Sequence, residues 1–99
     1  MINHVVLFKL NNYSQEEKKK LEMELKNRLE QLKEVIKEVR KIEVGLSCKP
    51  DTGSYDVALF SHFDSPEDLD RYRVHPEHLK VVEFIRNITQ ARASVDFEF

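Results

Sequence analysis

Three side chains that could take part in acid–base chemistry lie close together in the sequence, at Tyr72, His75 and His78. If helical geometry continues around Pro76, the two histidines lie three residues apart and share a face. Such a pair could act as a general acid and base or as half of a metal site, and the Tyr72 phenol could donate to a developing oxyanion. The alternative is structural: His75 caps a helix that begins at Pro76, and Tyr72 packs in the core.

A fourth candidate is His4, which stands among apolar residues near the start of the chain. Facing a cavity, a neutral imidazole could orient a substrate carbonyl or accept a proton near neutral pH. The alternative is a buried histidine whose polar atoms are satisfied by one protein partner. Residue type and position leave both interpretations open.

The sequence predicts neither a bound metal nor a cofactor. No Asp, Glu or Cys completes the pair of His75 and His78 at a recognisable spacing, and Glu77 is expected to point away from their shared face. Cys48 is the only cysteine, which excludes an intrachain disulfide and a zinc site built from several cysteines. No glycine-rich loop of the kind that holds phosphate groups is present.

Residues 2–10 are predicted to form the strand that positions His4, because they are rich in β-branched and aromatic side chains. Alternate residues of a strand share a face, and here both faces carry apolar side chains, so the strand needs cover on two sides. One face holds Ile2, His4, Val6, Phe8 and Leu10, and the other holds Asn3, Val5, Leu7 and Lys9.

A capping box from Ser14 to Glu17 predicts the start of a long helix. A strand over residues 42–46, a polar loop over residues 47–54 that contains Pro50 and Asp51, and a strand over residues 55–63 are expected to follow. The helix carries an apolar stripe expected to pack on a sheet, made of Leu21, Leu25, Leu29, Leu32, Ile36 and Val39.

A second helical region is expected to carry the Tyr72 cluster. Ser65 followed by Pro66 predicts its start, and Pro76 disfavours helical geometry at the preceding residue, which predicts a break there. A second helical piece is expected from about residue 76 to residue 87. A final strand over residues 91–99 alternates Ala93, Val95, Phe97 and Phe99 with Arg92, Ser94, Asp96 and Glu98.

The predicted order is βαββαβ, an α+β ferredoxin-like fold that forms one domain over residues 1–99. Right-handed crossovers place both helical regions on one face of a four-stranded antiparallel sheet. The other face would expose an apolar patch, which is rare in a monomer. We therefore expect a homodimer in which two sheets pack face to face in a dimeric α/β barrel. A lysine at Val6 is expected to disrupt this dimer if Val6 belongs to the shared face.

Composition limits the partners. The 99 residues carry a formal net charge of −2, which argues against nucleic-acid binding, because neutralised phosphates supply most of that affinity. An RNA-binding sheet is also disfavoured because the strands lack the required aromatic pattern. No signal-peptide pattern is visible, and the longest apolar run is too short to span a membrane. We therefore expect a cytoplasmic protein without a membrane partner.

Four stretches together resemble the stress-responsive dimeric α/β-barrel (Dabb) family: residues 4–9 (HVVLFK), 54–59 (SYDVAL), 72–78 (YRVHPEH) and 93–97 (ASVDF). The resemblance runs along essentially the whole chain and implies the fold and the dimer. Ferredoxin-like monooxygenases share the dimeric barrel, but the stretch over residues 72–78 favours the Dabb family.

The resemblance also implies a site. It indicates a cavity inside each protomer, lined by the first strand and the second helical region, in which His78, Tyr72 and His4 match catalytic or pocket residues of a polyketide cyclase in the family. The first function that we consider is a dimeric domain that binds a small apolar or aromatic metabolite. The alternative is a cofactor-free polyketide cyclase or lyase that uses a His/Tyr acid–base pair. The residues expected to bind the ligand are His4, Val6, Phe8, Tyr72, His75 and His78.

Overall fold

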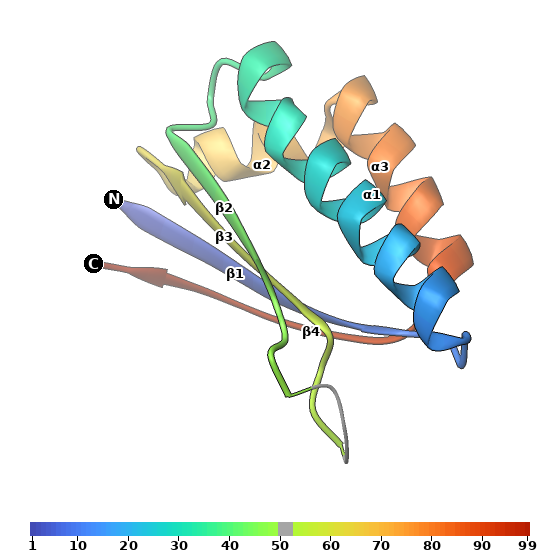
Figure 1. Ribbon diagram of the computed structural model, residues 1–99. Coiled ribbons are helices and arrows are strands. Elements are labelled where there is room, and N and C mark those ends of the chain that lie inside the picture. Colours follow the sequence, from blue (N-terminus) through green and yellow to red (C-terminus); the bar gives the residue numbers. More distant parts are fainter. Residues whose placement is uncertain (50–52) are drawn as a thin grey trace.

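The computed structural model describes residues 1–49 and 53–99, so Pro50 and Asp51 of the expected polar loop lie outside the described residues. The order of elements is βαββαβ, with the second helical region divided in two, as predicted (Figure 1). The elements are β1 (Ile2–Leu10), α1 (Gln15–Val35), β2 (Lys41–Leu46), β3 (Val57–Phe63), α2 (Pro66–Val74), α3 (Pro76–Ile88) and β4 (Thr89–Glu98).

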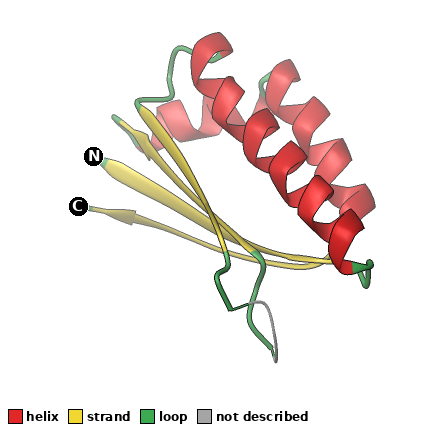
Figure 2. Ribbon diagram, viewed as in Figure 1, coloured by secondary structure: helices red, strands yellow, loops and turns green. Residues whose placement is uncertain are grey.

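The four strands form one antiparallel sheet in the order β2-β3-β1-β4. All three helices lie on the same side of it, and the other side carries no element of the protomer (Figures 1 and 2). This is the ferredoxin-like fold. β1 is central, so residues on its inner face look directly at the helices, whereas β4 lies at an edge.

The helix boundaries follow from local signals. The hydroxyl groups of Ser14 and Ser65 accept hydrogen bonds from backbone amides in the first turns of α1 and α2, as their positions predict. α1 ends at Val35, so Ile36 and Val39 of the predicted stripe lie beyond the helix and remain buried. The expected break falls at His75, whose extended backbone separates α2 from α3.

The core lies between the helices and the inner face of β1 and β3, where it includes Val6, Phe8, Leu59 and Phe63. Val6 is only 1% exposed within the protomer. The set of strand residues that contains Val6 therefore faces the helices, and the expectation that a lysine there would probe the dimer is wrong. Such a lysine would instead place a charge in the core of the protomer.

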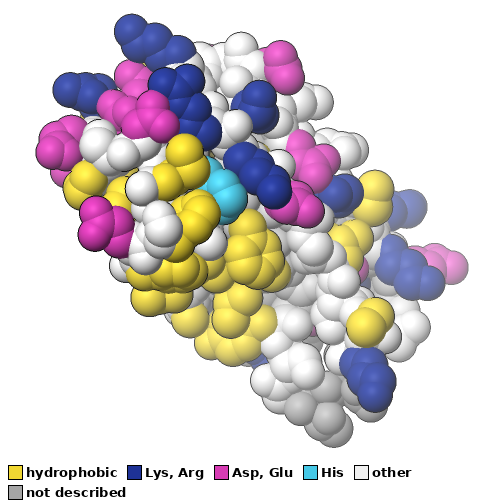
Figure 3. Space-filling model, turned by 90° about the vertical axis from the view of Figure 1, so that its left-hand side faces the viewer, with side chains coloured by type: hydrophobic (Ala, Val, Ile, Leu, Met, Phe, Trp, Pro, Cys, Tyr) yellow, Lys and Arg dark blue, Asp and Glu magenta, His cyan; other side chains and the backbone are white. Residues whose placement is uncertain are grey.

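The outer face of the sheet is apolar and uncovered in the protomer. Figure 3 shows hydrophobic side chains gathered on the face turned toward the viewer. The antiparallel register places Val5 of β1 opposite Val95 of β4, and Asn3 opposite Phe97. The large hydrophobic side chains exposed on this outer face are Leu7, Phe60, Val95 and Phe97.

The inner face of β4 is polar. Because the apolar residues of β4 point outward, its alternate residues must point toward the helices. The register places Arg92 opposite Phe8, Ser94 opposite Val6 and Asp96 opposite His4. β4 therefore brings charged side chains to the same face as the histidine of β1.

Candidate functional site

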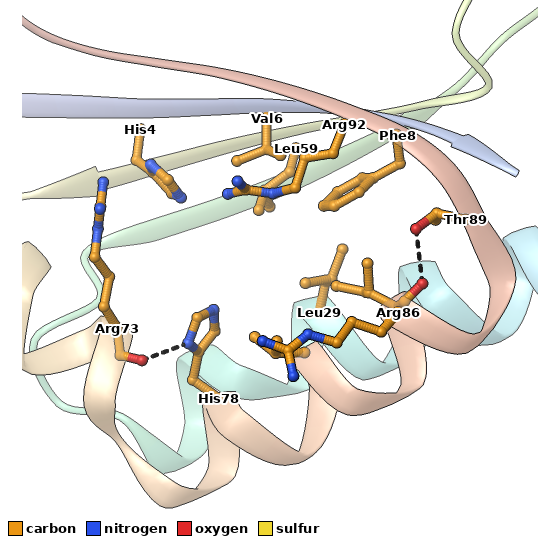
Figure 4. A pocket seen from close by; sticks show the side chains of 12 residues that line it. His4, Val6, Phe8, Leu29, Leu59, Arg73, His78, Arg86, Thr89 and Arg92 are labelled. Atoms are coloured by element: carbon orange, nitrogen blue, oxygen red, sulfur yellow. Dashed lines mark hydrogen bonds between the residues drawn. The ribbon is translucent and has the colours of Figure 1, made fainter.

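A cavity of about 320 Å³ lies between the sheet and the helices (Figure 4). β1 and β3 supply its roof, α3 and α1 supply its floor, and the end of α2 and the inner face of β4 close its sides. Its lining residues are His4, Val6, Phe8, Leu29, Leu59, Arg73, His78, Val82, Ile85, Arg86, Thr89 and Arg92.

His4 lies on the sheet side of this cavity and is 4% exposed. Its Nδ1 atom makes a hydrogen bond with the carboxylate of Asp96, whose second oxygen accepts from Arg73 Nη2 at 2.5 Å. Burial lowers the pKa of His4 more than the bond with Asp96 raises it, so the ring is neutral near pH 7. Since a carboxylate only accepts hydrogen bonds, Nδ1 carries the proton and Nε2 is left as an acceptor.

His78 lies on the helix side of the cavity, in the first turn of α3, and its ring points toward the space below His4 (Figure 4). Its Nδ1 atom lies 3.0 Å from the backbone oxygen of Arg73, which can only accept a hydrogen bond, so here too the proton is on Nδ1. Burial lowers the pKa of His78, opposed by this hydrogen bond. The cavity therefore lies between two neutral imidazoles, each held by its Nδ1 atom.

Tyr72 is fully buried and is not among the residues that line the cavity. Its ring centre lies 4.2 Å from that of His78 and 5.0 Å from that of Phe63. Burial raises the pKa of its phenol far above the ordinary value, so the group stays protonated. The hydroxyl oxygen has no hydrogen-bond partner within residues 1–49 and 53–99. The structure thus places Tyr72 behind His78, where its ring supports the imidazole.

His75 does not line the cavity. Its Nδ1 atom accepts a hydrogen bond from the backbone amide of Glu77 at 3.1 Å, so it is the N-cap of α3. His75 therefore caps the helix that begins at Pro76, which is the structural role considered for it from the sequence. By ending α2 and starting α3, His75 sets the direction in which α3 presents His78.

The remaining expected residues, Val6 and Phe8, do line the cavity beside His4. Three residues of the site were not predicted from the sequence: Arg73 and Arg92, which line the cavity, and Asp96, which contacts both His4 and Arg73 from outside the lining. The alternation of residues 91–99 contained the signal for two of them: pairing the final strand against the first would have placed Asp96 opposite His4 and Arg92 opposite Phe8. Arg73 reaches the cavity from the end of α2, and although Pro76 predicts the break that follows, no local spacing predicts the direction of α2 relative to the sheet.

Among the described residues, no group of three or more His, Cys, Asp or Glu side chains is placed to hold a metal ion. None of the helices in the described part of the chain is long and apolar enough to cross a membrane.

Comparisons with solved structures agree with this fold. A protein of unknown function from Bacteroides fragilis, described as dimeric and ferredoxin-like, is 38% identical and has a TM-score of 0.91; the match covers 99% of this chain and 95% of that one. A dimeric ferredoxin-like protein of unknown function from Thermobifida fusca is 23% identical, with a TM-score of 0.83 and coverage of 99% and 90%. A hydroxynitrile lyase from Passiflora edulis is 16% identical, with a TM-score of 0.80 and coverage of 97% and 90%.

The last two similarities show a shared fold, and no curated protein matches the chain. The family comparison is more specific, because the model of the stress responsive A/B barrel domain matches residues 2–99. With the fold, the matched range and the Bacteroides fragilis relative in agreement, this chain belongs to the stress responsive A/B barrel domain (Dabb) family.

Proposed function

We propose that this protein is a homodimer that binds a small molecule with an apolar or aromatic body in a cavity within each protomer. The observation that carries this proposal is the pair of neutral histidines, His4 and His78, which line one cavity from opposite sides. Apolar side chains line the space between them. A concave apolar site with a few convergent polar groups is typical of small-molecule binding.

The homodimer is supported by the outer face of the sheet. Apolar side chains on this face lie in the open in the protomer, and a second sheet packed against them would remove that surface from water. The Bacteroides fragilis relative, at 38% identity, is described as dimeric. The cavity lies on the opposite side of the sheet, so a dimer of this kind would leave it accessible.

The size and lining of the cavity support a small ligand. Its volume of about 320 Å³ is at the lower end of the range for small-molecule sites, roughly 300–1,000 Å³. The apolar part of the lining can cover a ring system, and each histidine offers an Nε2 atom to a donor on the ligand. The apolar lining residues are Val6, Phe8, Leu29, Leu59, Val82 and Ile85.

Calorimetry with the neutral probe 2-naphthamide tests this proposal. We expect binding to the wild-type protein and loss of binding in Val82→Phe, because the larger side chain occupies the cavity. Val74→Phe is the matched control, since Val74 lies on the helix surface and is 71% exposed. Equal binding by Val82→Phe and the wild type, or no binding by either, would contradict the proposal.

A cofactor-free cyclase or lyase is the second candidate, favoured by the orientation of the two histidines. Each has Nδ1 engaged and Nε2 available as a base at neutral pH. In this reaction the Nε2 atom of His78 would remove a proton next to a carbonyl group. The Nε2 atom of His4 is also an acceptor, so it would orient the substrate by accepting a hydrogen bond from a hydroxyl group. Tyr72, which packs against the His78 ring, would hold that base in position.

Deuterium incorporation from D₂O into an aromatic methyl ketone, followed by NMR, tests this chemistry without knowledge of the natural substrate. We expect catalysed exchange that falls by about a hundredfold in His78→Ala. His62→Gln is the control, because His62 lies on β3 and does not line the cavity. If exchange in the wild-type protein equals that in buffer, the binding function stands without the enzymatic one.

A further inference from the structure

We propose that the cavity selects ligands that carry a carboxylate, and that the guanidinium of Arg92 recognises this group. This inference rests on the proposed function, because it names the chemical class of the molecule that the cavity binds. It assigns the ligand two parts, an apolar body and an acidic group.

The charged side chains that line the cavity all have one sign. Arginines from three elements line it, Arg73 at the end of α2, Arg86 on α3 and Arg92 on β4, and no Asp or Glu is among its described lining residues. The two histidines are neutral near pH 7 because burial lowers the pKa of each. An anion that enters the cavity therefore meets positive charge without a competing carboxylate in the lining.

The three arginines differ in their partners. Arg73 is held by Asp96, through Nη2 and Oδ2 at 2.5 Å. Arg86 lies 3.9 Å from the exposed carboxylate of Glu83, which is a weak contact for solvated groups. No hydrogen bond or ion pair within residues 1–49 and 53–99 engages the Arg92 guanidinium, which extends over the cavity in Figure 4. Of these three arginines, Arg92 is thus the one without a charged partner among the described residues.

The position of Arg92 suits a ligand that also uses the apolar part of the cavity. The register places Arg92 opposite Phe8, and Arg92 lines the same cavity as the apolar residues Val6 and Leu59. Its positive charge contributes to lowering the pKa of both His4 and His78, so its field acts between the two imidazoles. A planar guanidinium can bind both oxygens of a carboxylate, a geometry that an amide cannot reproduce.

Two probes of the same shape separate this inference from the proposed function. Isothermal titration at pH 7 compares 2-naphthoate, which is an anion, with 2-naphthamide, which is neutral. We expect 2-naphthoate to bind about tenfold more tightly or better, because hydrogen bonds between charged groups are stronger. In Arg92→Gln this preference should disappear, so that the variant binds the two probes with similar affinity. Arg71→Gln, on the surface of α2 and outside the cavity lining, should behave as the wild type.

Each outcome has a distinct meaning. Equal affinities for the two probes in the wild-type protein would overturn carboxylate selection and leave the proposed function in place. A preference that survives in Arg92→Gln would overturn the role of Arg92. Absence of binding by both probes would overturn the inference together with the proposed function. Raising the salt concentration should weaken the binding of 2-naphthoate alone, and an effect on both probes alike would contradict an ionic contact.

Discussion

The inner and outer faces of the sheet carry different side chains, and the difference changes from the central strands to the edge strand. Over β1 and β3 the inner face is apolar and forms the core with the helices. At the edge strand β4 the pattern reverses: its apolar side chains, such as Val95 and Phe97, point outward, and its charged ones, such as Arg92 and Asp96, point inward. β4 thus supplies an apolar outer surface against which a second copy of the chain could pack, and it also supplies the charged groups beside the cavity on the inner face.

The largest effect is expected from a charge on the outer face. Phe97, at 43% exposed, belongs to the uncovered apolar surface, and in the proposed dimer Phe97→Lys would place an unpaired charge between two sheets. We expect loss of the dimer, or aggregation, because burying such a charge is costly. Sedimentation equilibrium measures the change, with a protomer mass of 11.8 kDa as the reference.

The matched control for this variant is Leu79→Lys. Leu79 is a large hydrophobic residue on α3 with a comparable exposure of 52%, but it lies on the helix side of the molecule. The dimer should persist in this variant. If the wild-type protein sediments as a folded monomer, the proposed dimer is contradicted. If the two variants behave alike, the outer face of the sheet is not the dimer interface.

The inner face should make stability depend on pH. The pKa values of His4 and His78 are lowered by burial from their ordinary value of 6.5, so below about pH 6.5 the unfolded chain binds protons that the folded chain does not. The free energy of unfolding should therefore fall as the pH drops from about 7.5 to 5.5. Urea denaturation measures this decrease. The decrease should be smaller in the double variant His4→Gln/His78→Gln. An unchanged decrease would mean that these two histidines do not cause the pH dependence.

The smallest effect concerns Tyr72, which lies between the core and the cavity. Its buried hydroxyl has no partner among the described residues, and an unsatisfied buried polar group costs about 1–3 kcal/mol. We expect Tyr72→Phe to keep or raise the free energy of unfolding in urea denaturation. If the phenol also serves a reaction, the same variant should lose deuterium exchange activity, which separates the two roles. A clear loss of stability would mean that the hydroxyl has a partner in solution.

Local signals were sufficient to predict most of the fold. Ser14, Ser65 and Pro66 marked the helix starts, and Pro76 marked the break, because caps and proline act through neighbouring backbone groups. Two-residue periodicity showed that the first strand has apolar residues on both faces. It did not show which face the helices cover, since that depends on packing between distant elements, and the expected role of Val6 was wrong for this reason.

The site was harder to predict because it depends on register and on helix direction. His4 and His78 were identified by residue type and by family resemblance, and both line the cavity. Asp96 was not connected with His4, although both are within the predicted strands, because the register between the first and last strands is set by contacts between residues far apart in the sequence. For His4 the two interpretations are compatible: Asp96 satisfies one ring nitrogen, and the other has no partner among the described residues and can bind a ligand.

NMR of the histidine side chains is the most direct test of the central claim, that His4 and His78 of one protomer line a ligand cavity. The chain has four histidines, of which His62 and His75 lie outside the cavity lining. Addition of 2-naphthamide should shift the imidazole signals of His4 and His78 together, at one saturating ligand per protomer, and leave those of His62 and His75 in place. Shifts confined to His62 or His75, or no shift for His4 and His78 at saturation, would contradict the account.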